Sequence, residues 1–146
     1  MIIEEFRNIK IAYLRRTGAY GLENQKLMVN FKRYLKDNQL FNNTTVILGI
    51  PLDNPANTPS EKLRYDVGIV IQGSEVHSLD TRKLDNGKYA IFEIPHTEQD
   101  VISFWNNLPN LTAGLPVDET KPVIERYSAM KIASHLCEFC IPLKSL

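Results

Sequence analysis

The chain has 146 residues, enough for one domain with a sizeable core. It carries 17 Lys and Arg against 17 Asp and Glu, with 43% hydrophobic and 23% charged residues. This composition is typical of a globular protein and argues against a disordered chain. The lack of a basic excess also argues against direct binding to DNA, because nucleic-acid binders must neutralise phosphates.

No apolar run approaches the roughly 18 to 20 residues that span a bilayer. The N-terminus carries Glu4 and Glu5 where a secretory signal would be basic. We therefore expect a cytoplasmic protein with no membrane contact.

Cys137 and Cys140 form a C-x-x-C in a strand-like run, where residues three apart point to opposite faces. This placement favours two structural thiols over a redox pair or a zinc site.

In the first half, β-branched and aromatic runs predict strands, and apolar residues at helical spacing predict one amphipathic helix. The expected elements are a strand at 9–15, a helix of about four turns around 27–35, a strand at 46–51, a loop at 52–61 and a strand at 63–71.

The second half repeats the pattern after an ambiguous stretch at 74–84. Asp85-Asn86-Gly87 is a strong turn signal, and Thr97 resembles a helix N-cap followed by an acidic first turn. The expected elements are a strand at 89–94, a helix from Thr97 to Leu108, a loop at 116–120 and strands at 123–128 and 136–143.

The order strand, helix, strand, strand thus occurs twice, which indicates an internal repeat of residues 1–73 and 74–146 within one domain. Two consecutive strands after each helix favour hairpins over parallel βαβ units. We predict an α+β fold of two tandem β-α-β-β modules with pseudo-twofold symmetry, in which an antiparallel sheet carries both helices on one face.

Carboxylates in the predicted strands are the main candidates for chemistry. Asp66 and Glu138 each lie mid-strand with small neighbours on their own face, which could leave a pocket floored by carboxylate. Glu125 and Tyr127 lie two residues apart and share a face. Carboxylates beside aromatic rings suit a planar or lipophilic cation. The alternative is that these acids are solvated surface charges.

Other chemistry has weaker signals. His77, His96 and His135 show neither metal-ligand spacing nor a nucleophilic partner, and the chain has no phosphate-binding or H-E-x-x-H motif. We expect no metal and no cofactor. Trp105 falls on the second amphipathic helix, where it either packs in the core or lines a pocket wall.

Several stretches together resemble the GyrI-like small-molecule-binding domain, which is also the effector-binding half of AraC-type and multidrug-responsive MerR-type transcription regulators. These stretches are 11–21, 48–55, 58–69, 87–92 and 138–143. The resemblance implies a central groove between the modules that binds lipophilic, often cationic molecules. It further implies that Glu125, in a Glu-x-Tyr element with Tyr127, and Glu138, before Ile-Pro, reach the ligand.

On this basis we expect a stand-alone small-molecule-binding protein, with charge from Glu125, Glu138 and Asp66 and walls from Tyr20, Trp105 and Tyr127. The alternative is a hydrolase of cyclopropanoid or similar electrophilic toxins, in which Glu138 acts with Trp105 and Tyr127. The third is a protein-interaction role with a partner such as DNA gyrase or a regulator. The expected elements include no helix-turn-helix, so we do not expect a complete AraC-type or MerR-type activator.

Overall fold

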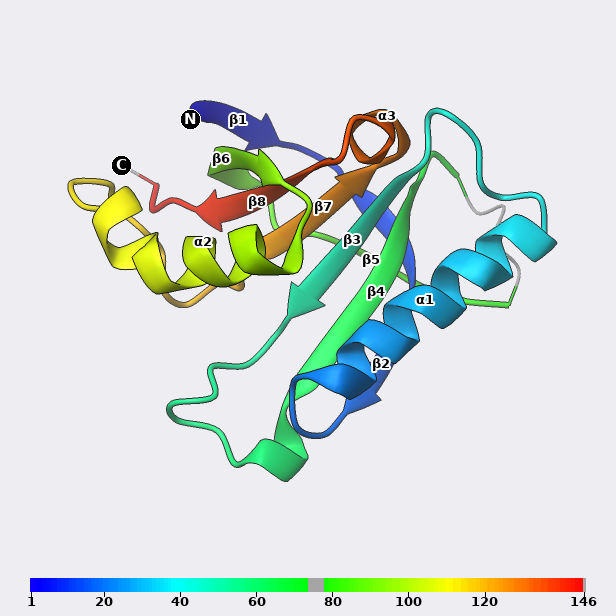
Figure 1. Cartoon of the computed structure of the whole chain (residues 1–146), viewed down its shortest axis with the longest axis horizontal. Helices are drawn as coiled ribbons and strands as arrows, with labels where there is room; N and C mark the ends of the chain where they lie inside the picture. Colours follow the sequence, from blue (N-terminus) through cyan, green and yellow to red (C-terminus); the bar gives the residue numbers. More distant parts are fainter. Residues whose placement is uncertain (74–77, 146) are drawn as a thin grey trace.

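The computed structural model describes residues 1–73 and 78–145 (Figure 1). The elements in chain order are β1 (Ile2–Phe6), β2 (Lys10–Thr17), α1 (Leu22–Asp37), β3 (Val46–Pro51), the 3₁₀ helix η1 (Ser60–Lys62), β4 (Arg64–Ile71), β5 (Asp80–Lys83), β6 (Gly87–Pro95), α2 (Glu98–Leu111), β7 (Ile124–Ser128), α3 (Ala129–Ala133) and β8 (Leu136–Pro142).

Within the described residues the strands form one eight-stranded antiparallel sheet in the order β1-β6-β8-β7-β3-β4-β2-β5. The units β2-α1-β3-β4 and β6-α2-β7-β8 have the same element order and the same strand pairing. They join at the centre, where β3 pairs with β7. The predicted α+β fold is confirmed, including the antiparallel pairing.

Both long helices cover the same side of the sheet, which we call the helix face. Figure 1 shows α2 over the half that contains β6 and β8, and α1 over the half that contains β2 and β4. Phe31 and Leu35 of α1 pack on the first half, and Phe104 of α2 stacks on Phe139 of the second, with ring centroids 4.4 Å apart. These contacts bury the apolar side of each amphipathic helix.

The opposite side, which we call the inner face, has a core of its own. Phe6 of β1 and Ile11 of β2 belong to one buried cluster on this face, together with Leu48 and Cys140. Since β1 and β2 lie near opposite ends of the sheet order, a buried cluster that contains residues of both strands requires the sheet to curl around this face. The curl brings charged side chains of distant strands together here.

The structure adds four short elements that the sequence patterns did not assign: the strands β1 and β5, the 3₁₀ helix η1 and the helix α3. Strand β1 pairs with β6 and strand β5 pairs with β2, so each extends one half of the sheet. Part of the ambiguous stretch, residues 74–77, lies outside the described residues, and the rest includes β5. Helix α3 follows β7, and the Ser128 hydroxyl caps it by accepting from the Lys131 amide.

The two cysteines lie as the strand alternation predicts. Cys137 packs among the side chains under α2, and Cys140 packs in the core of the inner face. Both are free and buried, and burial raises the pKa of Cys137 to about 11 and that of Cys140 to about 12. Thiols of this kind are inert packing groups at neutral pH.

Candidate functional site

The most unusual polar group on the helix face is the carboxyl of Glu125 on β7. Its Oε1 accepts a hydrogen bond of 2.7 Å from the Tyr65 hydroxyl and one of 3.3 Å from the Tyr127 hydroxyl. Within the described part of the chain, no Lys, Arg or His forms a salt bridge with it. Glu125 is therefore held by two neutral phenols and by no cation.

The surroundings of Glu125 favour its neutral form. Burial raises the pKa of this carboxyl, although the hydrogen bonds from Tyr65 and Tyr127 act in the opposite direction. Burial likewise raises the pKa of both phenols, which therefore stay protonated donors. Glu125 and Tyr127 still keep part of their surface accessible, whereas Tyr65 is 5% exposed. The carboxyl thus lies deep in the protein, in a residue that keeps part of its surface accessible.

Gly49 of β3 makes the space for this arrangement. It pairs directly with Glu125 across the strands, and a Cβ at this position would collide with the Tyr65 hydroxyl and with Glu125 Oε1. The glycine is needed here for close approach and not for its backbone conformation.

We expect Gly49→Ala to lower the free energy of unfolding by about 1–3 kcal/mol, as overpacking of a core does. Urea unfolding measures this change. Removing the colliding hydroxyl in Gly49→Ala/Tyr65→Phe should recover part of the loss relative to Tyr65→Phe alone. An alanine variant as stable as the wild type would show that the Tyr65–Glu125 pair shifts freely.

Two further aromatic rings pack against Tyr65 and Phe139, the neighbours of Glu125. Tyr20, from the loop before α1, packs edge-on against Tyr65 with centroids 6.2 Å apart, and its hydroxyl donates to the Arg64 carbonyl at 2.6 Å. Trp105 of α2 packs edge-on against Phe139, 5.4 Å away. Phe139 is in turn the strand partner of Glu125. Tyr20 and Trp105 are both half-buried.

Two basic side chains lie beside Tyr127. The ammonium of Lys32, on α1, sits over the Tyr127 ring at 5.4 Å from its centroid, and the His96 ring lies 5.5 Å from the same ring. Burial lowers the pKa of Lys32, and the charge of Lys36 adds to this effect. Burial also lowers the pKa of His96, with a further contribution from Lys32.

The inner face holds a different kind of site, centred on Arg126 of β7. Its guanidinium donates to both oxygens of Glu138 at 2.9 and 3.1 Å, and to both oxygens of Glu4 at 2.8 and 3.1 Å. Burial opposes the charge, but these hydrogen bonds raise the pKa of Arg126. A cavity of about 350 Å³ opens beside it, with Phe6 and Leu48 in its largely apolar wall.

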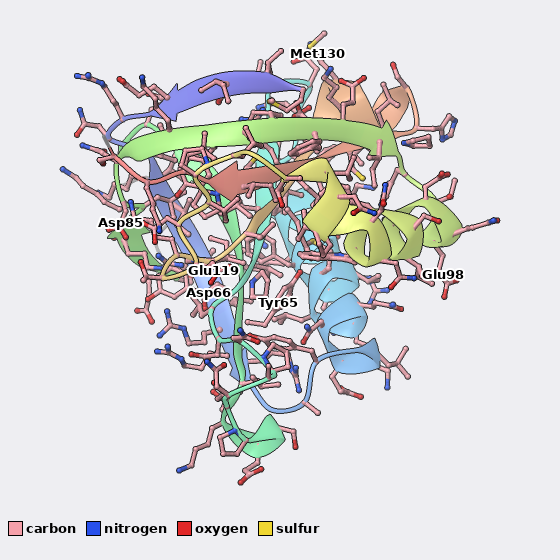
Figure 2. All side chains as sticks on the ribbon, turned by 90° about the vertical axis from the view of Figure 1, so that its left-hand side faces the viewer. Tyr65, Asp66, Asp85, Glu98, Glu119 and Met130 are labelled. Atoms are coloured by element: carbon pink, nitrogen blue, oxygen red, sulfur yellow. The ribbon has the colours of Figure 1, made fainter. Side chains whose placement is uncertain are left out.

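The other half of the inner face has the same arrangement with the charges reversed. Asp66, which has no exposed surface, accepts from Arg15 at 2.6 and 3.0 Å and from Arg82 at 2.8 and 3.2 Å. In Figure 2, the neighbouring Tyr65 and Asp66 point to opposite sides of the sheet, with Tyr65 toward α1. In one half two arginines therefore surround one buried carboxylate, and in the other half one arginine binds two carboxylates.

The structure divides the six residues predicted for the site between the two faces. Tyr20, Trp105, Glu125 and Tyr127 lie on the helix face, and Asp66 and Glu138 lie on the inner face. The expectation of a single acidic groove is wrong in this respect. The strand pairing is the reason, because Arg126 rather than Glu125 shares a face with Glu138.

The division also affects the hydrolase alternative. Glu138 does not face Trp105 and Tyr127, and Arg126 occupies both of its oxygens. The carboxyl beside Tyr127 is that of Glu125.

Sequence reasoning missed Tyr65, Gly49, Lys32 and Arg126. For Gly49 and Tyr65 the available signal was their place in the predicted strands at 46–51 and 63–71.

The described residues, 1–73 and 78–145, were compared with the requirements of a metal-ligand cluster and of a membrane-spanning helix. Across these ranges, no three His, Cys, Asp or Glu side chains gather in a way that could hold a metal ion. No helix in the same ranges is both long and apolar enough to cross a membrane.

Comparison with known proteins supports the fold and identifies the family. The model of the GyrI-like small molecule binding domain matches residues 1–144. The chain belongs to the GyrI-like family. This GyrI-like chain is also similar to the SPbeta prophage-derived protein YosT of Bacillus subtilis (strain 168), named as a candidate transcriptional regulator. The two are 40% identical over 146 aligned residues, which cover 97% of each chain.

Solved structures share the GyrI-like fold at low sequence identity. SAV2435 bound to tetraphenylphosphonium has a TM-score of 0.65 at 16% identity, and the match covers 99% of this chain and 93% of that one. The EcmrR C-terminal domain has a TM-score of 0.70 at 11% identity, covering 99% and 97%. The chain is thus a GyrI-like small-molecule-binding domain over nearly its whole length.

Proposed function

We propose that this GyrI-like domain binds a lipophilic, positively charged small molecule on the helix face, over Glu125. The observation that carries the proposal is the Glu125 carboxyl, which lies deep in the protein, has two phenol donors and lacks a cationic partner among the described residues. A ligand cation would supply the missing opposite charge where solvent screens it poorly. The flanking Tyr20, Trp105 and Tyr127 supply apolar area and cation–π attraction.

The inner face is the less suitable place for a cation. Arg126 already offsets one of the two charges of Glu138 and Glu4 and binds all four of their oxygens, and Arg15 and Arg82 surround Asp66. A cation there would have to compete with bidentate guanidinium hydrogen bonds, which are strong. The tetraphenylphosphonium bound to SAV2435 is consistent with a lipophilic cation in this fold and provides a probe.

The test is calorimetric titration of the wild type, Glu125→Gln and Glu4→Gln with tetraphenylphosphonium. We expect Glu125→Gln to weaken binding about tenfold or more, because it removes the buried charge and keeps the shape. Glu4→Gln removes one charge beside the inner-face cavity and should leave the affinity within about twofold.

Two results would contradict the proposal. Binding that depends on Glu4 and is indifferent to Glu125 would place the cation on the inner face. A wild-type protein that binds neither tetraphenylphosphonium nor other lipophilic cations of similar size would refute the ligand class itself.

A further inference from the structure

Lys32 of α1 has an unusual position for a lysine. Its ammonium sits over the Tyr127 ring, 5.4 Å from the centroid, and no carboxylate among the described residues pairs with it. The side chain is half-buried, and burial lowers its pKa. Most lysines avoid such a position, because the ammonium is strongly hydrated. An aromatic face partly compensates for the lost water.

The same ring belongs to the site proposed above. The Tyr127 hydroxyl hydrogen-bonds Glu125, and the face of Tyr127 is one of the surfaces on which a ligand cation would rest. Lys32 therefore occupies with its own positive charge a position that the cation needs.

We propose that Lys32 is a tethered competitor that sets the specificity of this site, since a lipophilic cation can occupy the Tyr127 face only by displacing its ammonium. This inference rests on the proposed function. Displacement moves the ammonium of a flexible side chain back into water, so it requires no change in the sheet. The bound cation then stands where Lys32 stood. Neutral molecules of the same shape must also displace the ammonium but meet no charge repulsion, so Lys32 disfavours cations more than it disfavours neutral molecules.

The charged and titratable groups around Lys32 fit this role. The basic group beside Lys32 at the Tyr127 ring is His96, after β6, whereas the ammonium of Lys36 on the same helix lies over the Phe41 ring instead. Glu125 lies beyond the Tyr127 hydroxyl. The site therefore combines a recessed acid with a basic rim. A bound cation is attracted by the carboxylate of Glu125 and repelled by the basic rim.

The chain offers a matched control on the same helix. The ammonium of Lys36 sits over the Phe41 ring at 5.3 Å, in the same kind of contact but over a ring that is not part of the proposed site. Lys36→Gln removes one positive charge and one cation–π contact, as Lys32→Gln does. A general effect of net charge would change both variants alike.

The experiment titrates the wild type, Lys32→Gln and Lys36→Gln with tetraphenylphosphonium and with the neutral triphenylphosphine oxide. We expect Lys32→Gln to tighten tetraphenylphosphonium binding about tenfold and to change binding of the neutral probe less than about twofold. Lys36→Gln should stay within about twofold for both probes. As a direct readout, the ε-methylene resonance of Lys32 should lose its ring-current shift when tetraphenylphosphonium binds.

The outcomes separate this inference from the function on which it rests. Suppose that the wild type binds tetraphenylphosphonium through Glu125. If Lys32→Gln then binds it no more tightly than the wild type, or if Lys36→Gln tightens binding as much as Lys32→Gln does, Lys32 is no competitor. The proposed function stands in both cases. If neither the wild type nor Lys32→Gln binds the cation, the proposed function fails and the inference fails with it. If only Lys32→Gln binds tetraphenylphosphonium, Lys32 is a competitor, and the proposed function stands only if the wild type binds another lipophilic cation of similar size.

Discussion

Replacing Arg126 with methionine should lower the free energy of unfolding by about 3–5 kcal/mol, the usual cost of removing one partner from a buried ion pair. The Arg126 side chain is 15% exposed and that of Glu138 is 9% exposed, so the variant leaves the Glu138 charge with little water to solvate it. Arg126 also links β7 to Glu4 on β1, across the intervening strands β8 and β6. Urea unfolding followed by circular dichroism measures the loss.

Two controls distinguish the effect of an unpaired Glu138 charge from the effect of a general loss of contacts. Lys131→Met breaks the exposed Lys131–Glu93 pair and should cost less than about 1 kcal/mol. Arg126→Met/Glu138→Met removes both charges and should be more stable than Arg126→Met alone, because apolar replacement of a whole buried pair is often nearly neutral. Equal stability of Arg126→Met and Lys131→Met would show that the network contributes little.

Local sequence patterns were sufficient to assign faces within single strands. Alternation placed Phe139 and Ile141 under the helices and Glu138 on the other side, and it separated Tyr65 from Asp66 in the same way. The reason is that the period of two is a property of each strand, independent of its neighbours.

Whether residues of different strands meet depends on register, which alternation within one strand does not reveal. A shift by one residue between β7 and β8 would exchange Glu125 and Arg126 as the neighbour of Glu138. Grouping the acids by residue type overlooked Arg126, which lies between Glu125 and Tyr127 and so must face away from both. Strands β1 and β5 escaped prediction because sheet pairing, rather than an alternating apolar pattern, defines them.

Binding of tetraphenylphosphonium should become tighter as the pH rises, by up to about tenfold per pH unit while Glu125 is mostly protonated in the free protein. The sign follows from the raised pKa of Glu125, which burial keeps neutral over a wider pH range than an exposed glutamate. A cation binds the ionised carboxylate better, so binding releases a proton. Above the raised pKa the carboxyl is already ionised, and the slope should vanish. Calorimetry in two buffers of different ionisation enthalpy counts the released proton.

The same linkage predicts that the stability of the folded protein falls as the pH rises, whereas its affinity for the cation increases. Because the folded-state pKa of Glu125 exceeds its unfolded value, folding favours the protonated form, and this contribution is lost as the pH rises through the interval between the two values. Glu125→Gln has no such loss. It should therefore be more stable than the wild type at pH values above that interval and closer to it in stability in acid. Its cation affinity should be the lower of the two at the pH values where the wild-type carboxyl is ionised in the complex.

His96 is the group most able to imitate this pH dependence. Burial lowers its pKa, and its loss of charge with rising pH would also favour a cation beside Tyr127. Cys137, with a pKa of about 11, titrates above the relevant range. His96→Gln should therefore keep the slope and the proton release, whereas Glu125→Gln should lose both. A slope that persists in Glu125→Gln and disappears in His96→Gln would assign the proton to the histidine and contradict a neutral Glu125 in the free protein.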